Sequence, residues 1–233
     1  MASDYARKIK ALLAKAKSTT NEHERDSYQA QATRLMAKWG VDDAMLAAEE
    51  DQVIITEQFR MEHQPLDGWC VLLDNVARGL GTVRVLASGM LTGDFVILYL
   101  VGHRSDVDRL KILWDYLHPQ ASVALQAYWD HYVRFMPPTE AIIDWLAHTK
   151  RAQFLASYGN SVGNRLQQEK EDATKSVSGS DLVLVDRKKQ VDDFVDENIK
   201  PQDTTFYYYE DLSARIAGWT GGAQATLRGS DDA

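Results

Sequence analysis

Residues Lys8–Asp43 read KIKALLAKAKSTTNEHERDSYQAQATRLMAKWGVDD and decide the fold of the N-terminal part of the chain. Apolar residues recur at three- and four-residue steps in both halves of this stretch, as they do on one face of an amphipathic helix. They are Tyr5, Ile9, Leu12, Leu13 and Ala16 in the first half, and Tyr28, Ala32, Leu35, Met36 and Trp39 in the second. Asn21 and Glu24 have the spacing of a capping box, and Gly40 suits a left-handed helix end. The stretch predicts a helical hairpin, which we expect to pack on the rest of the chain through Leu12, Leu13, Leu35 and Trp39.

The same residues carry a resemblance to a known family. The pattern I-x-x-LL-A-K-A-x-ST-x-x-E-x-E, which starts at Ile9 and is followed by LMAK-x-G and an acidic pair, resembles the module called domain of unknown function 2786. That module occurs in bacteria and their phages. The stretches RAQFLASYGNSVGNRL and SGSDLVLVDRKKQVDDFV are similar to the C-terminal region that often follows it. The resemblance implies a bacterial or phage setting and a two-part chain, but no activity.

The remainder of the chain has a mixed α/β pattern. Val53–Met61 alternates apolar and polar residues, as a half-buried strand does, and Leu66–Leu80 has the apolar spacing of a helix. TVRVLAS and DFVILYLVG, joined by GMLTG, predict a hairpin with glycine at the turn. We expect short strands at 182–185 and 204–211, and a final helix from Leu212 whose small residues dock tightly. The fold class is therefore α+β, with a hairpin module over 1–50 and a helix-rich mixed α/β body with a small sheet over 51–233.

Helices fill most of this second part. Ser105 and Asp108 predict a capping box that starts a helix, and Pro119 should break that helix. Another helix is expected from Thr139 through Leu166, in which Gly159 and Gly163 share one face and indicate close backbone packing. Residues 167–180 are polar and predict a fraying helix end with a loop, after which Asp186 should cap the next helix.

Charge is distributed unevenly along the chain. The formal net charge is −8, yet the first helix is basic and the connector after it is acidic. The basic residues of the first helix are Arg7, Lys8, Lys10, Lys15 and Lys17. They form either a solvated helix face or a small patch for phosphate contacts, and a broadly acidic chain favours the first.

Several classes of site lack their sequence signatures. No G-x-x-x-x-G-K-[ST] phosphate loop and no G-x-S-x-G elbow occur, and His118, His131 and His148 are too far apart for a helical zinc site. The single cysteine, Cys70, lies in an apolar segment, so we expect it in the core. No cofactor and no metal are therefore predicted. Neither a membrane span nor a secretion signal is evident, which together with the one cysteine favours the cytoplasm.

Two further groups of residues are candidates for binding. His103 and Arg104 should lie on a strand-to-helix loop beside free backbone N–H groups, where anions bind. Arg187, Lys188 and Lys189 form a second basic run. The sequence favours a non-enzymatic phage-type accessory protein that binds a macromolecule, with a protein partner preferred. One alternative is a nucleic-acid binder that uses the basic helix. The other is an enzyme of unrecognised class, with His103, Arg104 and Asp186 as its first suspects.

Overall fold

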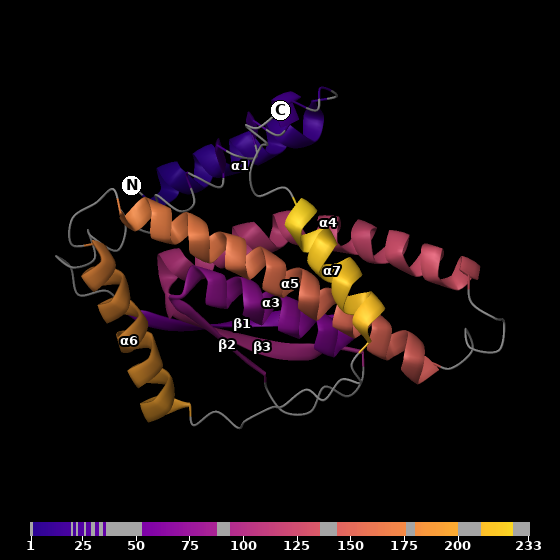
Figure 1. The fold of residues 1–233 in the computed structure, drawn as a ribbon. Coiled ribbons are helices and arrows are strands. Elements are labelled where there is room, and N and C mark those ends of the chain that lie inside the picture. Colours follow the sequence, from indigo (N-terminus) through magenta and orange to yellow (C-terminus); the bar gives the residue numbers. More distant parts are fainter. Residues whose placement is uncertain are drawn as a thin grey trace.

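The fold consists of a small antiparallel sheet beneath crossed helices (Figure 1). The computed structural model describes residues 2–19, 21, 23–25, 27–28, 31–32, 35, 53–87, 94–135, 144–175, 180–199 and 211–225. The elements are α1 (Ala2–Ser18), β1 (Ile54–Met61), α3 (Leu66–Leu80), β2 (Val83–Ala87), β3 (Val96–His103), α4 (Arg104–Phe135), α5 (Asp144–Thr174), α6 (Ser180–Asn198) and α7 (Leu212–Gln224). This architecture confirms the α+β class. The expected division near residue 50 falls in a stretch outside the described residues.

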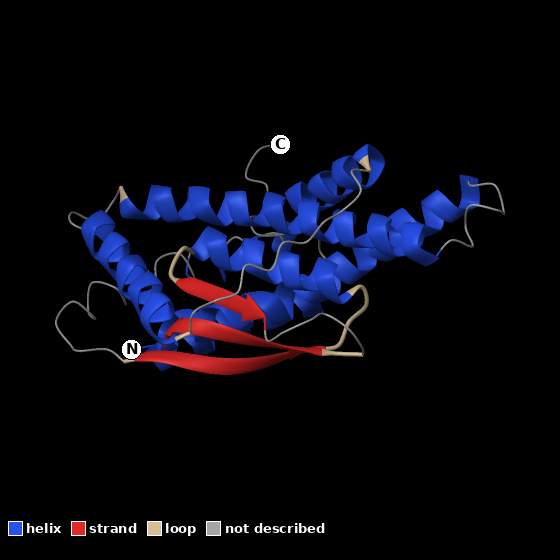
Figure 2. Ribbon diagram, turned by 90° about the horizontal axis from the view of Figure 1, so that it is seen from below, coloured by secondary structure: helices blue, strands red, loops and turns tan. Residues whose placement is uncertain are grey.

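The sheet has the strand order β1-β3-β2, and both pairings are antiparallel. Met61 lies opposite Val96, and Val83 lies opposite Gly102, so the antiparallel pairing expected of β2 and β3 is confirmed. The expected glycine turn between them lies in residues 88–93, outside the described part. Because side chains alternate along a strand, Val96, Leu98 and Leu100 share one face. That face belongs to the main hydrophobic core, together with buried residues of α3 and α4. The strands appear on the underside of the helices in Figure 2.

Helix α6 belongs to the opposite face of the sheet. Val191 and Val195 of α6 form a small separate cluster with Val101, and Tyr99 and Leu86 of the sheet pack against it. This cluster is far smaller than the main core. Helix α6 is therefore attached to the molecule over a limited apolar contact.

Helices α3, α5 and α7 cross at backbone distance, because glycines line their contacts. A Cβ atom added to Gly79 would lie 2.5 Å from the carbonyl oxygen of Gly163, and one added to Gly159 would lie 2.7 Å from Leu72 Cα. Such separations leave no room for a side chain. The close packing expected of Gly159 and Gly163 is confirmed, as is the tight docking of α7, whose Gly218 and Gly222 contact the backbone of α5.

The N-terminal hairpin packs on the body. Asn21 Oδ1 accepts hydrogen bonds from the backbone N–H groups of His23 and Glu24, as its predicted capping role requires. Glu24 departs from the capping box, because its carboxylate accepts instead from the Thr19 hydroxyl at 2.9 Å. Ile9 and Ala32 are fully buried in the main core, and Leu12 and Leu35 pack against it. The residues Met36, Trp39 and Gly40 lie outside the described part, and so does the side chain of Leu13.

The break expected at Pro119 is wrong, since α4 continues through it to Phe135. A proline in a helix removes one backbone N–H donor and disturbs the preceding turn. Two side chains donate to backbone carbonyl groups in the turns next to the proline. Gln120 Nε2 donates to the carbonyl of Tyr116 at 3.2 Å, and the Ser122 hydroxyl donates to that of His118 at 2.9 Å. Helix α4 is one of the longest helices, yet no helix among the described residues is long and apolar enough to cross a bilayer.

Two further expectations near the C-terminus are also wrong. Residues 182–185 belong to helix α6, because a run of four apolar residues cannot distinguish a strand from a helix turn. Asp186 consequently lies within α6, where it accepts a hydrogen bond from Gln190, and caps nothing. The polar segment after Leu166 stays helical to Thr174. Residues 139–143, 176–179 and 204–210 lie outside the described part, so the expected helix start at Thr139 and the aromatic strand stay predictions.

Candidate functional site

The basic residues of α1 are exposed where their side chains are described. Arg7, Lys8 and Lys15 face solvent. The Lys15 ammonium also lies 5.6 Å from the ring centroid of Tyr28, which ties it to the second helix of the hairpin. The side chains of Lys10 and Lys17 lie outside the described part. The described side chains of this face therefore present spread positive charge.

The strand-to-helix loop expected at His103 and Arg104 does not exist. Strand β3 continues to His103, which lies opposite Ile54, and α4 begins at the next residue. His103 shares the sheet face of Val101, toward α6, and only 2% of its surface is exposed. Arg104 is exposed, as is Asp186 on α6. These three residues therefore do not line one solvent-facing catalytic site. The capping box at Ser105 and Asp108 is wrong as well, because the helix starts before it and Ser105 has another partner.

That partner is Arg187, which joins α6 to the start of α4. Its Nη2 donates to the Ser105 hydroxyl at 3.0 Å, and its Nε lies 3.2 Å from the carboxylate of Asp106. The other oxygen of Asp106 lies 2.9 Å from Arg109 Nη2, and the same nitrogen donates to the Thr82 hydroxyl at 3.4 Å. Asp106, Arg109 and Arg187 are all at least 95% buried. One carboxylate thus links two buried guanidinium groups from two helices.

A second aspartate has the same role nearer the surface. Asp192 of α6 lies 2.6 Å from Arg84 of β2 and 2.5 Å from Lys188. Burial alone would raise the pKa of Asp192, but the hydrogen bonds from Lys188 and Arg84 outweigh it and hold the pKa below its usual value. Lys188 is exposed. The sequence-predicted residue Arg187 therefore belongs to the contact between α6 and the body, whereas Lys188 pairs within α6 with Asp192, which itself contacts Arg84.

Lys170 of α5 completes this set of charges. Its ammonium donates to the carbonyl oxygen of Leu80 at 3.3 Å, where α3 ends, and it lies over Gly81. Burial lowers the pKa of Lys170, and the positive charges of Arg109 and Lys188 lower it further. We call this set the polar junction; it comprises Arg84, Asp106, Arg109, Lys170, Arg187, Lys188 and Asp192. Sequence reasoning missed most of its members. The three-residue spacing of Asp106 and Arg109 was a usable signal, whereas Lys170 had none.

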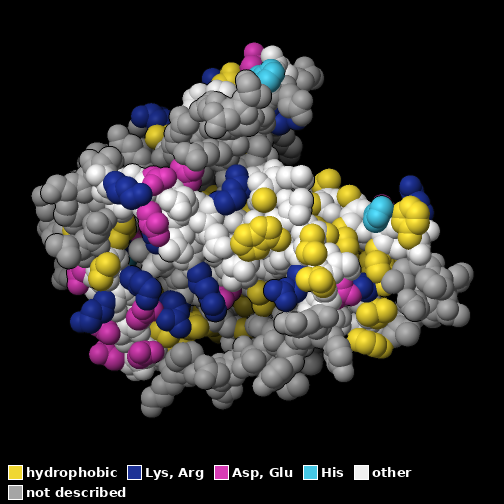
Figure 3. Space-filling view, in the orientation of Figure 1, with side chains coloured by type: hydrophobic (Ala, Val, Ile, Leu, Met, Phe, Trp, Pro, Cys, Tyr) yellow, Lys and Arg dark blue, Asp and Glu magenta, His cyan; other side chains and the backbone are white. Residues whose placement is uncertain are grey.

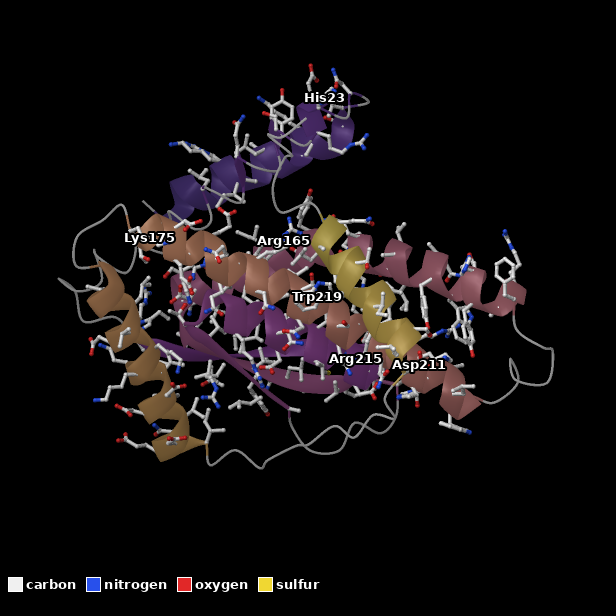
Figure 4. The ribbon with its side chains drawn as sticks, viewed as in Figure 1. His23, Arg165, Lys175, Asp211, Arg215 and Trp219 are labelled. Atoms are coloured by element: carbon white, nitrogen blue, oxygen red, sulfur yellow. The ribbon has the colours of Figure 1, made fainter. Side chains whose placement is uncertain are left out.

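Helix α7 offers a different surface. Leu212, Ile216 and Trp219 are four and three residues apart, so they form one stripe along the helix. They are 68%, 58% and 45% exposed, respectively. The opposite side of α7 is occupied by Gly218 and Gly222 against α5. Trp219 and Arg215 are marked on this helix in Figure 4. Sequence reasoning predicted only the docked side and missed the outer stripe, although its spacing was visible.

The histidines and the cysteine considered as possible site residues pack against, or pair with, other side chains of the fold. His118 packs against Trp69 and Trp114, and burial lowers its pKa. His148 lies 3.0 Å from Asp67 at the surface. Among the described residues, no group of three His, Cys, Asp or Glu side chains is arranged to hold a metal ion. Cys70 is buried as expected, and burial raises the pKa of its thiol to about 12, which makes it a poor nucleophile.

Comparison with protein families identifies one segment of the chain. Residues 5–43 match the model described as protein of unknown function, DUF2786, which confirms the resemblance of the N-terminal hairpin. The matched segment covers α1 from Tyr5 onward and the described part of the second helix. No curated protein and no solved structure matches the chain. The similarity of residues 151–166 and 178–195 to the region that often follows this module stays a prediction.

Proposed function

We propose that this is a non-enzymatic accessory protein that binds a protein partner through the outer face of α7. The observation that carries the proposal is the apolar stripe of Leu212, Ile216 and Trp219. A surface helix normally turns its large apolar residues toward the core. Here glycines take the inner side and the large side chains point outward, so the stripe contributes little to the core. Exposed apolar patches of this kind are typical of interaction sites.

The chemistry of the stripe favours a protein over other macromolecules. Tryptophan, isoleucine and leucine have apolar side chains that are buried away from water in the core of an interface. Tryptophan is also enriched among the residues that contribute most to binding energy. Arg215 lies on the same side of α7, between Leu212 and Trp219 in sequence. Figure 3 shows apolar side chains gathered over α7 on this face of the molecule. A partner with an apolar helix and some acidic residues would complement this surface.

A pair of matched double variants tests the proposal. The first is Ile216→Ser with Trp219→Ser, on the stripe. The control is Val123→Ser with Val185→Ser, which removes two apolar residues of α4 and α6 that are more exposed than Ile216 and Trp219. We expect both variants to keep the thermal midpoint, because none of the four residues is buried. Proteins that copurify from the producing cells with the parent and the control should be lost from the stripe variant. Recovery of the same partners in equal amounts with both variants would overturn the proposal.

The exposed Arg7, Lys8 and Lys15 favour nucleic acid as the second candidate partner. An acidic chain with a small basic face should bind it weakly, and the affinity should fall steeply with salt. Changing Lys8, Lys10, Lys15 and Lys17 together to Gln should abolish retention on a DNA column at low salt. Binding that survives high salt, or that is unchanged in this variant, would contradict contact through α1.

The proposed setting is the bacterial cytoplasm, including that of a cell infected by a phage. It is supported by the match of residues 5–43 and by the single buried cysteine, which suits a reducing compartment.

A further inference from the structure

The polar junction gathers cationic groups from four elements of the fold. Arg84 comes from β2, Arg109 from α4, Lys170 from α5, and Arg187 and Lys188 from α6. Two aspartates lie among them, and each is shared by two cations. Asp106 contacts Arg109 and Arg187, and Asp192 contacts Arg84 and Lys188. Figure 3 shows Lys and Arg side chains gathered beside α6 on this face.

Lys170 is the member whose position the fold explains least. In the described part of the chain its ammonium donates to one neutral oxygen, the Leu80 carbonyl, and makes no ion pair with a carboxylate. A lysine side chain that is half-buried normally keeps its charge in water or beside an acid. Here burial has the largest effect on the pKa of Lys170; the charges of Arg109 and Lys188 lower the pKa further, those of Glu171 and Asp106 raise it, and the net shift is downward.

The local geometry brings Lys170 next to Arg109. The ammonium of Lys170 lies 2.5 Å from the point where a Cβ atom of Gly81 would be, so the glycine makes room for it. The following residue, Thr82, accepts a hydrogen bond from Arg109. Two cations, Lys170 and Arg109, therefore contact two adjacent residues, Gly81 and Thr82. Lys170 and Gly81 are half-buried and Lys188 is exposed, so this side of the junction reaches solvent.

We propose that the polar junction binds one phosphoryl group between Lys170, Arg109 and Lys188. A phosphoryl group carries up to two negative charges and several acceptor oxygens, which suits cationic donors that come from three helices. Guanidinium groups recognise such oxygens with directed hydrogen bonds, and a lysine adds a compact charge. Bound phosphate would also balance the cations that surround Lys170. The group can belong to free phosphate or to a small phosphorylated metabolite.

Calorimetric titration of the full chain with inorganic phosphate tests this site. The titration is run at constant pH and ionic strength, with chloride as the reference anion. We expect one phosphate per chain. The variant Lys170→Met should bind about tenfold more weakly or worse, the loss expected for one charge-assisted hydrogen bond. Lys175→Met is the matched control, because Lys175 lies five residues further on, is exposed, and pairs with Asp172 at 2.9 Å. Its binding should equal that of the parent.

A second variant keeps the test valid if Lys170→Met fails to fold. Lys188→Gln changes an exposed residue, so its fold should persist while its affinity for phosphate falls. A parallel titration with a nucleoside 5′-monophosphate separates the two sources of the group. If phosphate and the nucleoside monophosphate bind with equal affinity, the site recognises the phosphoryl group alone. If the nucleoside monophosphate binds and phosphate does not, the ligand is a phosphorylated metabolite. Absence of binding by the parent to both ligands, or equal binding by the Lys170→Met and Lys175→Met variants, would overturn the proposal.

Discussion

Helix α5 meets the rest of the molecule in two chemically different ways. Between residues 152 and 163 it crosses α3 and α7 at backbone distance, with glycines and buried apolar side chains at the contact. Near Lys170 it instead reaches the polar junction, where α6 and the start of α4 are joined mainly by charged groups. The first region is apolar and closely packed, whereas the second contains several charges with limited apolar support.

The difference indicates which region fixes the fold. Contacts at backbone distance exclude water and allow one helix arrangement, so they stabilise a unique structure. Buried ion pairs lose much of their attraction to the cost of removing charges from water, and apolar replacements are often as stable. The polar junction is therefore poorly explained as a stabilising device. This agrees with the phosphoryl site that we propose there.

The largest expected effect comes from Asp106→Ala. This change removes the carboxylate that two buried guanidinium groups share, and breaking a buried ion pair in this way costs about 3–5 kcal/mol. Urea unfolding measures the loss. Asp192→Ala is the control, since Asp192 also bridges two cations but at a partly exposed position, where about 1 kcal/mol or less is expected. Equal losses in the two variants would show that burial does not distinguish the two bridges.

Next in size is Gly163→Ala in the helix crossing. A Cβ atom there would lie 2.4 Å from the carbonyl oxygen of Asn75. Forcing α3 and α5 apart should cost about 1–3 kcal/mol, even though alanine is the better helix former. The control is Gly221→Ala on α7, whose nearest neighbour is a Tyr158 ring atom at 3.3 Å. Thermal unfolding should show a clear loss for the first variant and little change for the second. A Gly163→Ala protein as stable as the parent would refute contact at backbone distance.

The smallest effect concerns Asp211, which accepts from the backbone N–H of Ala214 at the start of α7 and pairs with Lys150 of α5. Burial opposes ionisation, but the bonds from Lys150, Ser213 and Ala214 prevail and lower the pKa of Asp211. A carboxyl whose pKa is lower in the folded state stabilises the fold above its unfolded pKa of about 4, and this contribution disappears as the pH falls through the folded value.

Asp211→Asn should accordingly be less stable than the parent at pH 7, by about 1 kcal/mol or less. The two proteins should converge as the pH falls through the lowered pKa of Asp211 and the parent carboxyl becomes protonated. Urea titrations at several pH values check this. A constant difference between the proteins across the whole range would mean that the charge of Asp211 does not hold α7 on α5.

The sequence predicts contacts that depend on local pattern and misses those that depend on distant residues. The β2–β3 hairpin, helix α3 and the glycine face of α5 follow from turn residues and apolar spacing. The break expected at Pro119 was wrong because a proline removes only one backbone donor, and Leu117 and Ala121 on either side of it pack in the core of a continuous helix. Within the polar junction, Arg187 and Lys188 were candidates from the sequence and the spacing of Asp106 and Arg109 was a usable signal, but nothing local relates Lys170 to Arg109.

Native-state hydrogen exchange tests most directly the claim that one region fixes the fold and the other is attached to it. It measures the free energy at which individual amide groups open. Amides of α5 between residues 155 and 163 should exchange only through global unfolding, at the full free energy of unfolding. Amides of α6 around Val191 and Val195 should open at a distinctly lower free energy, because their apolar contact is small. Protection of α6 equal to that of α5 would contradict the division of the molecule into these two regions.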